Sequence, residues 1–158
     1  MTQRAQQAAP PEVRRSVEVP VGVDRAFELF TTRMSDFWPR AHSIGTTPMA
    51  AVEVEPEVGG RWFERGEDGT ECPWGRVAAW EPPSRLVLVW QVSADWRYDP
   101  ELETEVEIAF TATEVGCRVD LTHDLSAYGE RAGDMHAVFA TPNAWQATLG
   151  AFARVAGG

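Results

Sequence analysis

The sequence predicts a single α+β domain in which an antiparallel sheet of about seven strands packs against a long C-terminal helix. A chain of 158 residues has the usual length of one domain. The stretch 49–125 alternates apolar and polar residues in short runs separated by turn residues, a pattern typical of a meandering antiparallel sheet. One segment before this stretch and one after it repeat their apolar residues with the period of a helix.

The chain is expected to begin with a flexible leader, residues 1–12, followed by one domain that spans 13–158. The leader is rich in Gln, Ala and Pro and lacks an apolar period. Residues 14–20 alternate apolar with polar side chains and predict the first strand. Residues 23–32 change to a helical period, and a second short helix over 34–38 is ended by a proline.

Six more strands are predicted in the alternating stretch, with their ends set by turn residues. Gly59-Gly60 indicates a bulge or a tight turn, the GEDG of 66–69 a hairpin turn, and the EPPS of 81–84 the turn of a second hairpin. The predicted strands are 51–58, 61–66, 71–80, 85–92, 104–113 and 117–125.

The chain is expected to end in a helix, preceded by a short irregular helix over 130–139. Thr141 is a preferred N-cap residue type and Pro142 suits the first helical position. The residues that follow at i, i+4 and i+7 are large and apolar: Trp145, Leu149 and Phe152. Such a stripe has to be buried, so this helix is predicted to dock on the sheet.

Charge and motifs exclude several classes of protein. The net charge of −10 repels phosphate backbones and anionic membrane surfaces, so nucleic-acid partners are not expected. No apolar run approaches the roughly 20 residues that cross a bilayer, and the N-terminus lacks a signal peptide's apolar middle, which favours a cytoplasmic protein. No phosphate-binding loop, nucleophile elbow or clustered His and Cys residues occur, so neither a cofactor nor a metal is expected.

Several stretches, taken in order, resemble the SRPBCC superfamily, which includes the START lipid-transfer domains, the birch-pollen allergen and polyketide cyclases. They are VEVPVGVDRAFELFT, EPEVGGRWFE, GRVAAWEPPSRLVLVW, TEVEIAFT and CRVDLTHDL, followed by a helix that contains a tryptophan. Within that group, WPRAHSIG at 38–45 and ECPWG at 71–75 are similar to bacterial homologues of the activator of the 90-kDa heat-shock protein ATPase. The resemblance covers residues 14–156 and implies the helix-grip fold, a curved antiparallel sheet wrapped around a long C-terminal helix with a cavity between them.

The tryptophans are the first candidates for the walls of that cavity. On the strand over 85–92, Leu86, Leu88 and Trp90 share one face, which is turned towards the C-terminal helix if it is the concave face. Aromatic walls with a few polar groups are typical of small-molecule sites, although plain core packing is the alternative for each tryptophan. The candidate walls are Trp38, Trp62, Trp74, Trp90 and Trp145.

Three polar residues are candidates for anchoring a ligand in the same cavity. His123 has the parity of inward-facing residues on its strand, so it is either a polar anchor or a core histidine. His42 lies in the loop after Trp38, where the mouth of the cavity is expected. Glu64 is expected to point inwards or to form a solvent-facing ion pair, and the same alternatives apply to Glu71.

The first functional hypothesis is therefore non-catalytic binding of a small, largely apolar or aromatic ligand. The second is an enzyme such as a cyclase, dehydratase or hydrolase that uses general acid/base chemistry in the same cavity. The third, implied only by the resemblance, is a stress-response protein whose partner is a heat-shock chaperone. A monomer and a homodimer are both compatible with the sequence.

Overall fold

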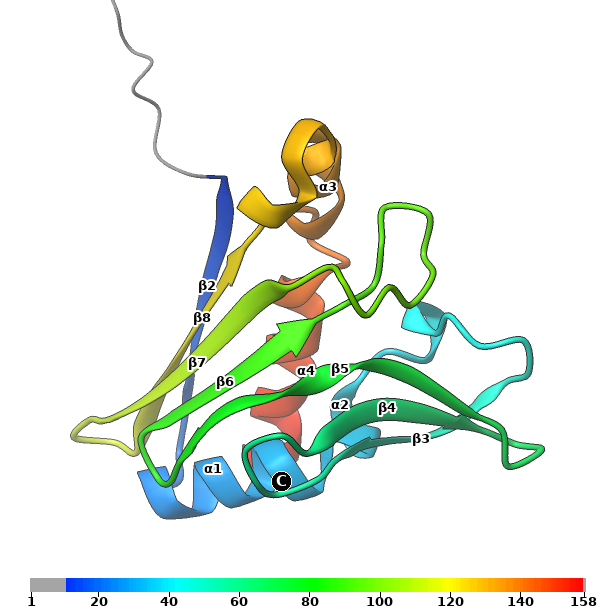
Figure 1. Cartoon of the computed structure of the whole chain (residues 1–158). Helices are drawn as coiled ribbons and strands as arrows, with labels where there is room; N and C mark the ends of the chain where they lie inside the picture. Colours follow the sequence, from blue (N-terminus) through cyan, green and yellow to red (C-terminus); the bar gives the residue numbers. More distant parts are fainter. Residues whose placement is uncertain (1–10, 158) are drawn as a thin grey trace, which may run out of the picture.

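The computed structural model describes residues 11–157, which form one sheet and several helices (Figure 1). The elements are β2 (Glu12–Val19), α1 (Val23–Thr32), α2 (Met34–Phe37), the 3-10 helix η1 (Arg40–His42), β3 (Met49–Val54), β4 (Arg61–Gly66), β5 (Glu71–Glu81), β6 (Arg85–Trp90), β7 (Thr104–Ala112), β8 (Cys117–Asp124), the 3-10 helix η2 (Ser126–Arg131), α3 (Ala132–Phe139) and α4 (Trp145–Gly157).

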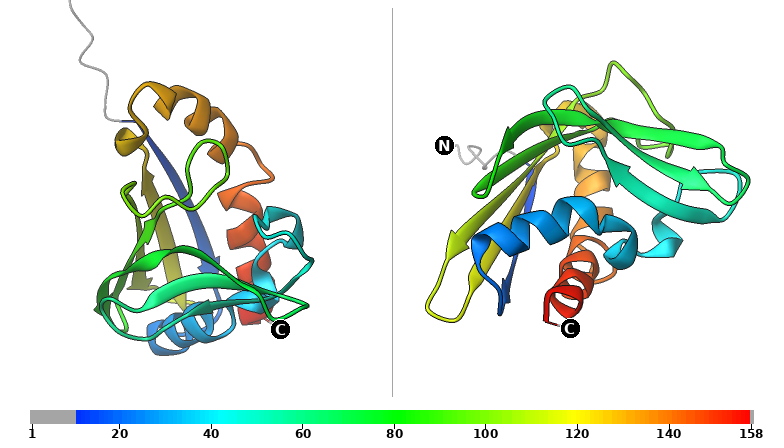
Figure 2. Two further views of the ribbon diagram at one scale, coloured as in Figure 1. Left: turned by 45° about the vertical axis from the view of Figure 1, so that its right-hand side comes forward. Right: turned by 90° about the horizontal axis from the view of Figure 1, so that it is seen from below.

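The sheet has seven strands in the order β2-β8-β7-β6-β5-β4-β3, and every neighbouring pair is antiparallel. Strands β3 to β8 follow one another as a meander, and β2 from the N-terminal end joins β8 at the edge. The sheet curves around α4, which lies on its concave side, while α1 crosses one end of the sheet (Figures 1 and 2). This arrangement confirms the predicted helix-grip architecture.

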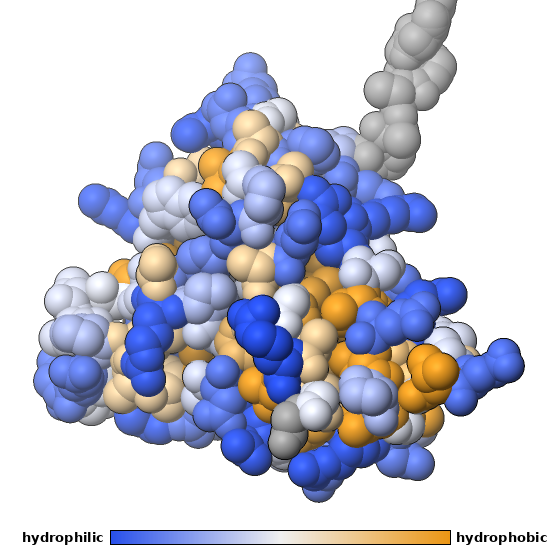
Figure 3. All heavy atoms as spheres, turned by 180° about the vertical axis from the view of Figure 1, so that it is seen from behind, coloured by the Kyte–Doolittle hydropathy of each residue, from blue (hydrophilic) through white to orange (hydrophobic). Residues whose placement is uncertain are grey.

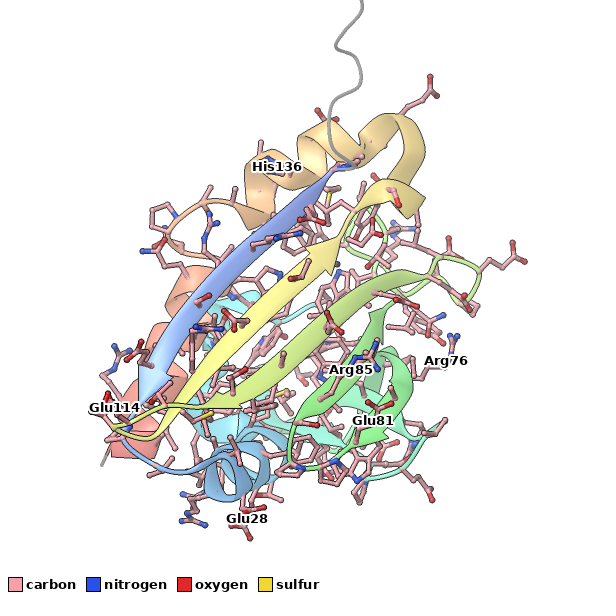
Figure 4. The ribbon with its side chains drawn as sticks, turned by 90° about the vertical axis from the view of Figure 1, so that its left-hand side faces the viewer. Glu28, Arg76, Glu81, Arg85, Glu114 and His136 are labelled. Atoms are coloured by element: carbon pink, nitrogen blue, oxygen red, sulfur yellow. The ribbon has the colours of Figure 1, made fainter. Side chains whose placement is uncertain are left out.

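The alternation in the sequence places one face of most strands in the core. On β8, Val119 and Leu121 are buried while Arg118 is exposed. The central strand β6 differs because Val87 and Val89, which face away from α4, are buried as well. Charged side chains lie beside them on that outer face, where Arg85 of β6 pairs with Glu107 of β7 at 2.6 Å. Figure 4 shows this outer face with Arg76, Glu81 and Arg85 along it.

The C-terminal helix begins three residues later than the predicted first helical position. The hydroxyl of Thr141 donates back to the carbonyl of Val138 at 2.9 Å and so does not cap the following helix. Residues 142–144 form a turn, and α4 starts at Trp145. The N-cap prediction was therefore wrong, whereas the apolar stripe of Trp145, Leu149 and Phe152 is buried as expected.

Two predicted strands were too long, and part of the leader falls outside the described residues. β3 ends at Val54 because residues 55–60 turn back on themselves, with the amide of Glu57 bonded to the carbonyl of Glu55. β6 ends at Trp90, after which the chain forms only an isolated bridge between Val92 and Tyr98. Residues 1–10 of the predicted leader lie outside the described residues, and β2 already begins at Glu12.

Charged side chains surround an apolar region on the face of the molecule on which α4 lies (Figure 3). Seen from behind, apolar side chains gather in the middle and lower right of the face on which α4 lies, with charged side chains around them (Figure 3). Within the part of the chain that is described, no helix is both long and apolar enough to span a membrane.

Candidate functional site

A cavity of about 380 Å³ opens at the N-terminal end of α4, where three connecting segments meet. These segments are the loop around η1, the connection between β6 and β7, and the link from α3 to α4 (Figures 1 and 2). Its volume falls within the range of small-molecule sites. The lining residues are Trp38, Ala41, His42, Ser43, Ile44, Trp90, Trp96, Val138, Phe139, Ala144, Trp145 and Thr148.

Five of the lining side chains are aromatic, and they form two walls. Trp38 and Trp90 are tilted by 31° with their ring centroids 6.3 Å apart. Phe139 and Trp145 are stacked at 23° with centroids 6.5 Å apart. The two pairs meet where Trp38 stands edge-on to Trp145, at 5.5 Å and 84°. Aromatic rings held in this way offer both faces and edges to a flat apolar molecule.

Two of the predicted walls lie behind the cavity instead of lining it. Trp62 and Trp74 are fully buried and pack against the far sides of Trp38 and Trp90, with Trp38–Trp74 centroids 4.8 Å apart. Gly75 pairs with Trp90 and brings β5 so close to β6 that an added Cβ would lie 1.7 Å from the carbonyl oxygen of Val89. Trp62 and Trp74 are therefore core residues, which was the alternative considered for each tryptophan.

Glu64 is buried and holds the loop that forms one side of the cavity. Its carboxylate accepts hydrogen bonds from the indole of Trp74 at 2.9 Å, from the backbone N–H of Ile44 at 2.8 Å and from the hydroxyl of Ser43. The solvent-facing ion pairs belong to Glu71, which binds Arg61 and Arg65. Glu64 thus points inwards, as one of the two alternatives expected, but it shapes the loop over 43–45 and does not line the cavity.

His123 also points inwards, but it lies behind the wall formed by Phe139 and Trp145. Its ring contacts Phe139 with centroids 4.8 Å apart, and its Nδ1 accepts the indole N–H of Trp145 at 3.1 Å. Its Nε2 lies 2.8 Å from the hydroxyl of Thr104, which donates its own hydrogen to the carbonyl of Trp90 at 2.8 Å. Because Nδ1 accepts, Nε2 carries the proton and donates to Thr104.

The environment of His123 keeps the imidazole neutral. Complete burial lowers its pKa from 6.5 to about 3, and the nearby charge of Asp124 only partly opposes this shift. Both ring nitrogens are already satisfied in the neutral form, so a proton could be added only by breaking the bond to Trp145. In this state His123 cannot act as a general acid or base near pH 7.

His42 is the titratable side chain that lines the cavity. It lies on η1, and burial lowers its pKa below 6.5, while a backbone hydrogen bond with Asn143 partly opposes the shift. The imidazole is therefore neutral at pH 7. The indole of Trp38 donates to the backbone carbonyl of His42 at 3.3 Å, which keeps η1 against the aromatic wall.

The sequence interpretation missed two of the aromatic side chains at the cavity. Trp96 lies in the connection between β6 and β7, with a φ of 63° that is rare for a bulky residue. A turn closed by Ser93 holds it there, and its side chain stays 43% exposed at the rim. Phe139 ends α3, which was expected only as an irregular helix. The available signal was a tryptophan placed in an otherwise polar connection.

Comparison with known proteins identifies the family. The model of the family described as Activator of Hsp90 ATPase homolog 1-like protein matches residues 20–157. No curated protein matches the chain.

Solved structures give the same picture. An anthrahydroquino-γ-pyrone synthase, solved in a complex, is 38% identical, with 92% of this chain and 96% of that chain covered and a TM-score of 0.64. A protein from Mycobacterium smegmatis is 16% identical over 92% of this chain and 90% of its own, with a TM-score of 0.67. An AHSA1-like protein from Aeromonas hydrophila is 17% identical over 90% of each chain, with a TM-score of 0.59, and at such identities the likeness concerns the fold alone. With its helix-grip fold and a family match over nearly its whole described length, the chain belongs to the Activator of Hsp90 ATPase homolog 1-like proteins of the SRPBCC superfamily.

Proposed function

We propose that the cavity binds a planar, largely apolar aromatic molecule and that the protein catalyses ring formation on it. The observation that carries the proposal is the convergence of five aromatic side chains and one neutral histidine on a single cavity. Flat rings are the ligand shape that such walls contact over the largest area.

The choice of ring formation over simple binding is supported by the relative that shares 38% of its residues with this chain. That protein is a synthase of an anthrahydroquinone fused to a γ-pyrone, and the match covers nearly all of both chains. An anthrahydroquinone is a flat three-ring system, which suits the aromatic walls. Non-catalytic binding, the first hypothesis from the sequence, then describes only the first step of the reaction.

The residue proposed as the general base is His42, since it faces the cavity and is neutral at pH 7. A phenol next to a 1,3-diketone side chain can close a γ-pyrone in two steps. His42 takes the phenolic proton while the oxygen adds to the distal carbonyl carbon, and it then returns this proton to the resulting alkoxide, which completes a hemiketal. The hemiketal hydroxyl then leaves as water, with a proton from the neighbouring carbon, and no oxidant or reductant is needed.

Binding is tested by titrating 2-methoxyanthracene and following energy transfer from the tryptophans to its fluorescence. Val138 is 41% exposed and lines the cavity, so Val138→Arg places a charge at the mouth without disturbing the core. We expect this variant to weaken binding more than tenfold. Val58→Arg is the matched control because Val58 is 66% exposed and is not a lining residue. If both variants bind 2-methoxyanthracene with equal affinity, the cavity is not the binding site.

Catalysis is tested with an anthraquinone that carries a phenol and an adjacent 1,3-diketone side chain, and the loss of one water is followed by mass spectrometry. We expect His42→Gln to lower kcat by about a hundredfold, as is usual for loss of a general base. The dissociation constant of 2-methoxyanthracene is measured in parallel. Wild-type protein that binds the planar probe but does not accelerate ring closure would leave only non-catalytic binding.

A further inference from the structure

We propose that the ligand is anchored by a hydrogen-bond donor of its own, a neutral phenolic hydroxyl, and that carboxylates and other anions are excluded. This inference rests on the proposed binding of a planar aromatic molecule. It follows from the hydrogen bonds of the cavity wall: two indole N–H groups and two hydroxyl groups donate to acceptors within the protein, whereas hydroxyl oxygens and one nitrogen of His42 keep lone pairs.

The indole N–H groups of three wall tryptophans are withheld from a ligand. Trp38 donates to the carbonyl of His42 at 3.3 Å, and Trp145 donates to Nδ1 of His123 at 3.1 Å. The indole N–H of Trp90 has no hydrogen-bond partner among the described residues, but its nitrogen is buried although the residue lines the cavity. The fourth tryptophan, Trp96, stands at the exposed rim.

The two hydroxyl groups of the lining are committed in the same way. Ser43 donates its hydrogen to the buried carboxylate of Glu64. Thr148 donates to the carbonyl of Ala144 at 3.4 Å, one turn earlier on α4. A hydroxyl that has used its only hydrogen can still accept through two lone pairs. Ser43 already accepts the backbone N–H of Gly45 at 3.3 Å and keeps one lone pair for a donor on the ligand, as does the oxygen of Thr148.

His42 completes the set as an acceptor. Burial keeps its ring neutral, so one ring nitrogen carries a hydrogen and the other carries a lone pair. The nitrogen with the lone pair can accept a hydrogen bond from a ligand. No Arg, Asp or Glu side chain is among the residues that line this cavity, so nothing in its wall compensates the desolvation of a ligand's carboxylate.

The test compares three probes with the same three-ring skeleton: 2-hydroxyanthracene, 2-methoxyanthracene and anthracene-2-carboxylate. We expect 2-hydroxyanthracene to bind about five- to tenfold more tightly than 2-methoxyanthracene, the usual gain from one hydrogen bond. We expect anthracene-2-carboxylate to bind at least tenfold more weakly than 2-methoxyanthracene.

Two variants show whether the preference comes from the acceptors named above. His42→Phe removes the ring nitrogen, and Thr148→Val removes the hydroxyl with little change of shape. We expect the ratio of the two dissociation constants, methoxy over hydroxy, to fall towards one in at least one of them. A ratio that survives in both variants, or tightest binding of the carboxylate, would overturn the inference.

The outcomes separate this inference from the proposed function. If the three probes bind equally well, the planar site stands and the phenolic anchor is wrong. If none of them binds, the proposed function fails as well.

Discussion

Trp145 donates its indole N–H to Nδ1 of His123 over 3.1 Å. The histidine does not line the cavity, but this bond fixes the orientation of Trp145, which does. The other ring nitrogen of His123 donates to Thr104, and Thr104 donates to the carbonyl of Trp90. A chain of three hydrogen bonds thus joins two opposed wall residues from behind. In this chain His123 is a positioning residue, and its neutral form is the one that the geometry requires.

The first prediction concerns acid sensitivity. Because burial lowers the pKa of His123 to about 3 from 6.5, the unfolded chain binds this proton below pH 6.5 while the folded protein does not. The stability from His123 is therefore complete above pH 6.5 and is lost as the pH falls towards about 3. From pH 6.5 to pH 5, linkage gives a loss of about 2 kcal/mol in the free energy of unfolding.

Urea unfolding of wild type and His123→Phe across this pH range measures the effect. We expect the variant to be less stable at pH 7, since the donor of Trp145 is left unpaired, but to lose less stability on acidification. Identical slopes for the two proteins would show that His123 does not titrate as described. As a check on the wild type alone, the imidazole NMR signals of His123 should stay at their neutral positions down to pH 5.

The second prediction separates Glu64 from Glu71. Glu64→Leu leaves the buried donors of Trp74 and Ile44 unsatisfied, and each lost partner costs about 1–3 kcal/mol. We therefore expect a loss of about 2–5 kcal/mol in urea unfolding, together with weaker binding of the planar probe, because the loop over 43–45 is released. Glu71 lies on the neighbouring strand with an exposed side chain, so Glu71→Leu should change stability little and leave binding intact. Equal losses in the two variants would contradict the role of Glu64.

The third prediction concerns the close approach of β5 and β6. In Gly75→Ala the new Cβ would lie 1.7 Å from the carbonyl oxygen of Val89, so the strands must separate beside Trp90. We expect destabilisation of about 3 kcal/mol or more, by thermal or urea unfolding. Gly133→Ala in α3 is the control: its Cβ meets nothing within 4 Å, and a gain of about 0.5–1 kcal/mol is expected. A mild effect at Gly75 would mean that the two strands are not held this close.

The fourth prediction tests the backbone at Trp96, whose φ of 63° is strained for any residue with a side chain. Trp96→Gly and Trp96→Ala both remove the indole from the rim, so both should weaken binding of the planar probe. Since only glycine adopts this φ freely, Trp96→Gly should be more stable than Trp96→Ala by about 1 kcal/mol. The reverse order would show that the turn does not hold this conformation.

Much of the fold could be predicted because strand and helix periods are local properties of the sequence. The alternation of Val119, Leu121 and His123 correctly predicts that all three face inwards on β8. The stripe of Trp145, Leu149 and Phe152 correctly predicts a buried face for α4. The predicted start of α4 was wrong because the hydroxyl of Thr141 donates to the preceding carbonyl of Val138 and does not cap the following helix. A threonine can form either of these local hydrogen bonds, and the residue type does not decide between them.

The candidate site could be predicted only in part. The sequence marks Trp62, Trp74 and Trp90 as candidate walls and argues parity for Trp90, but the curvature of the sheet decides that Trp90 reaches the cavity and the other two fill the layer behind it. Trp96 reaches the rim through a turn with a rare backbone conformation, which no periodic pattern reveals.

By itself, the sequence determined the order of the elements, the set of candidate aromatic residues and the resemblance that the family match confirms. The tertiary structure alone decided which of these aromatic residues face the cavity, that Glu64 holds a loop, and that His123 is held neutral by Trp145 and Thr104. The physical reason is the distance along the sequence over which each interaction acts. Periodicity and turn chemistry act over a few neighbouring residues, whereas the direction of a hydrogen atom at the cavity wall depends on partners that can be 20 or more residues away, as with His123 and Trp145.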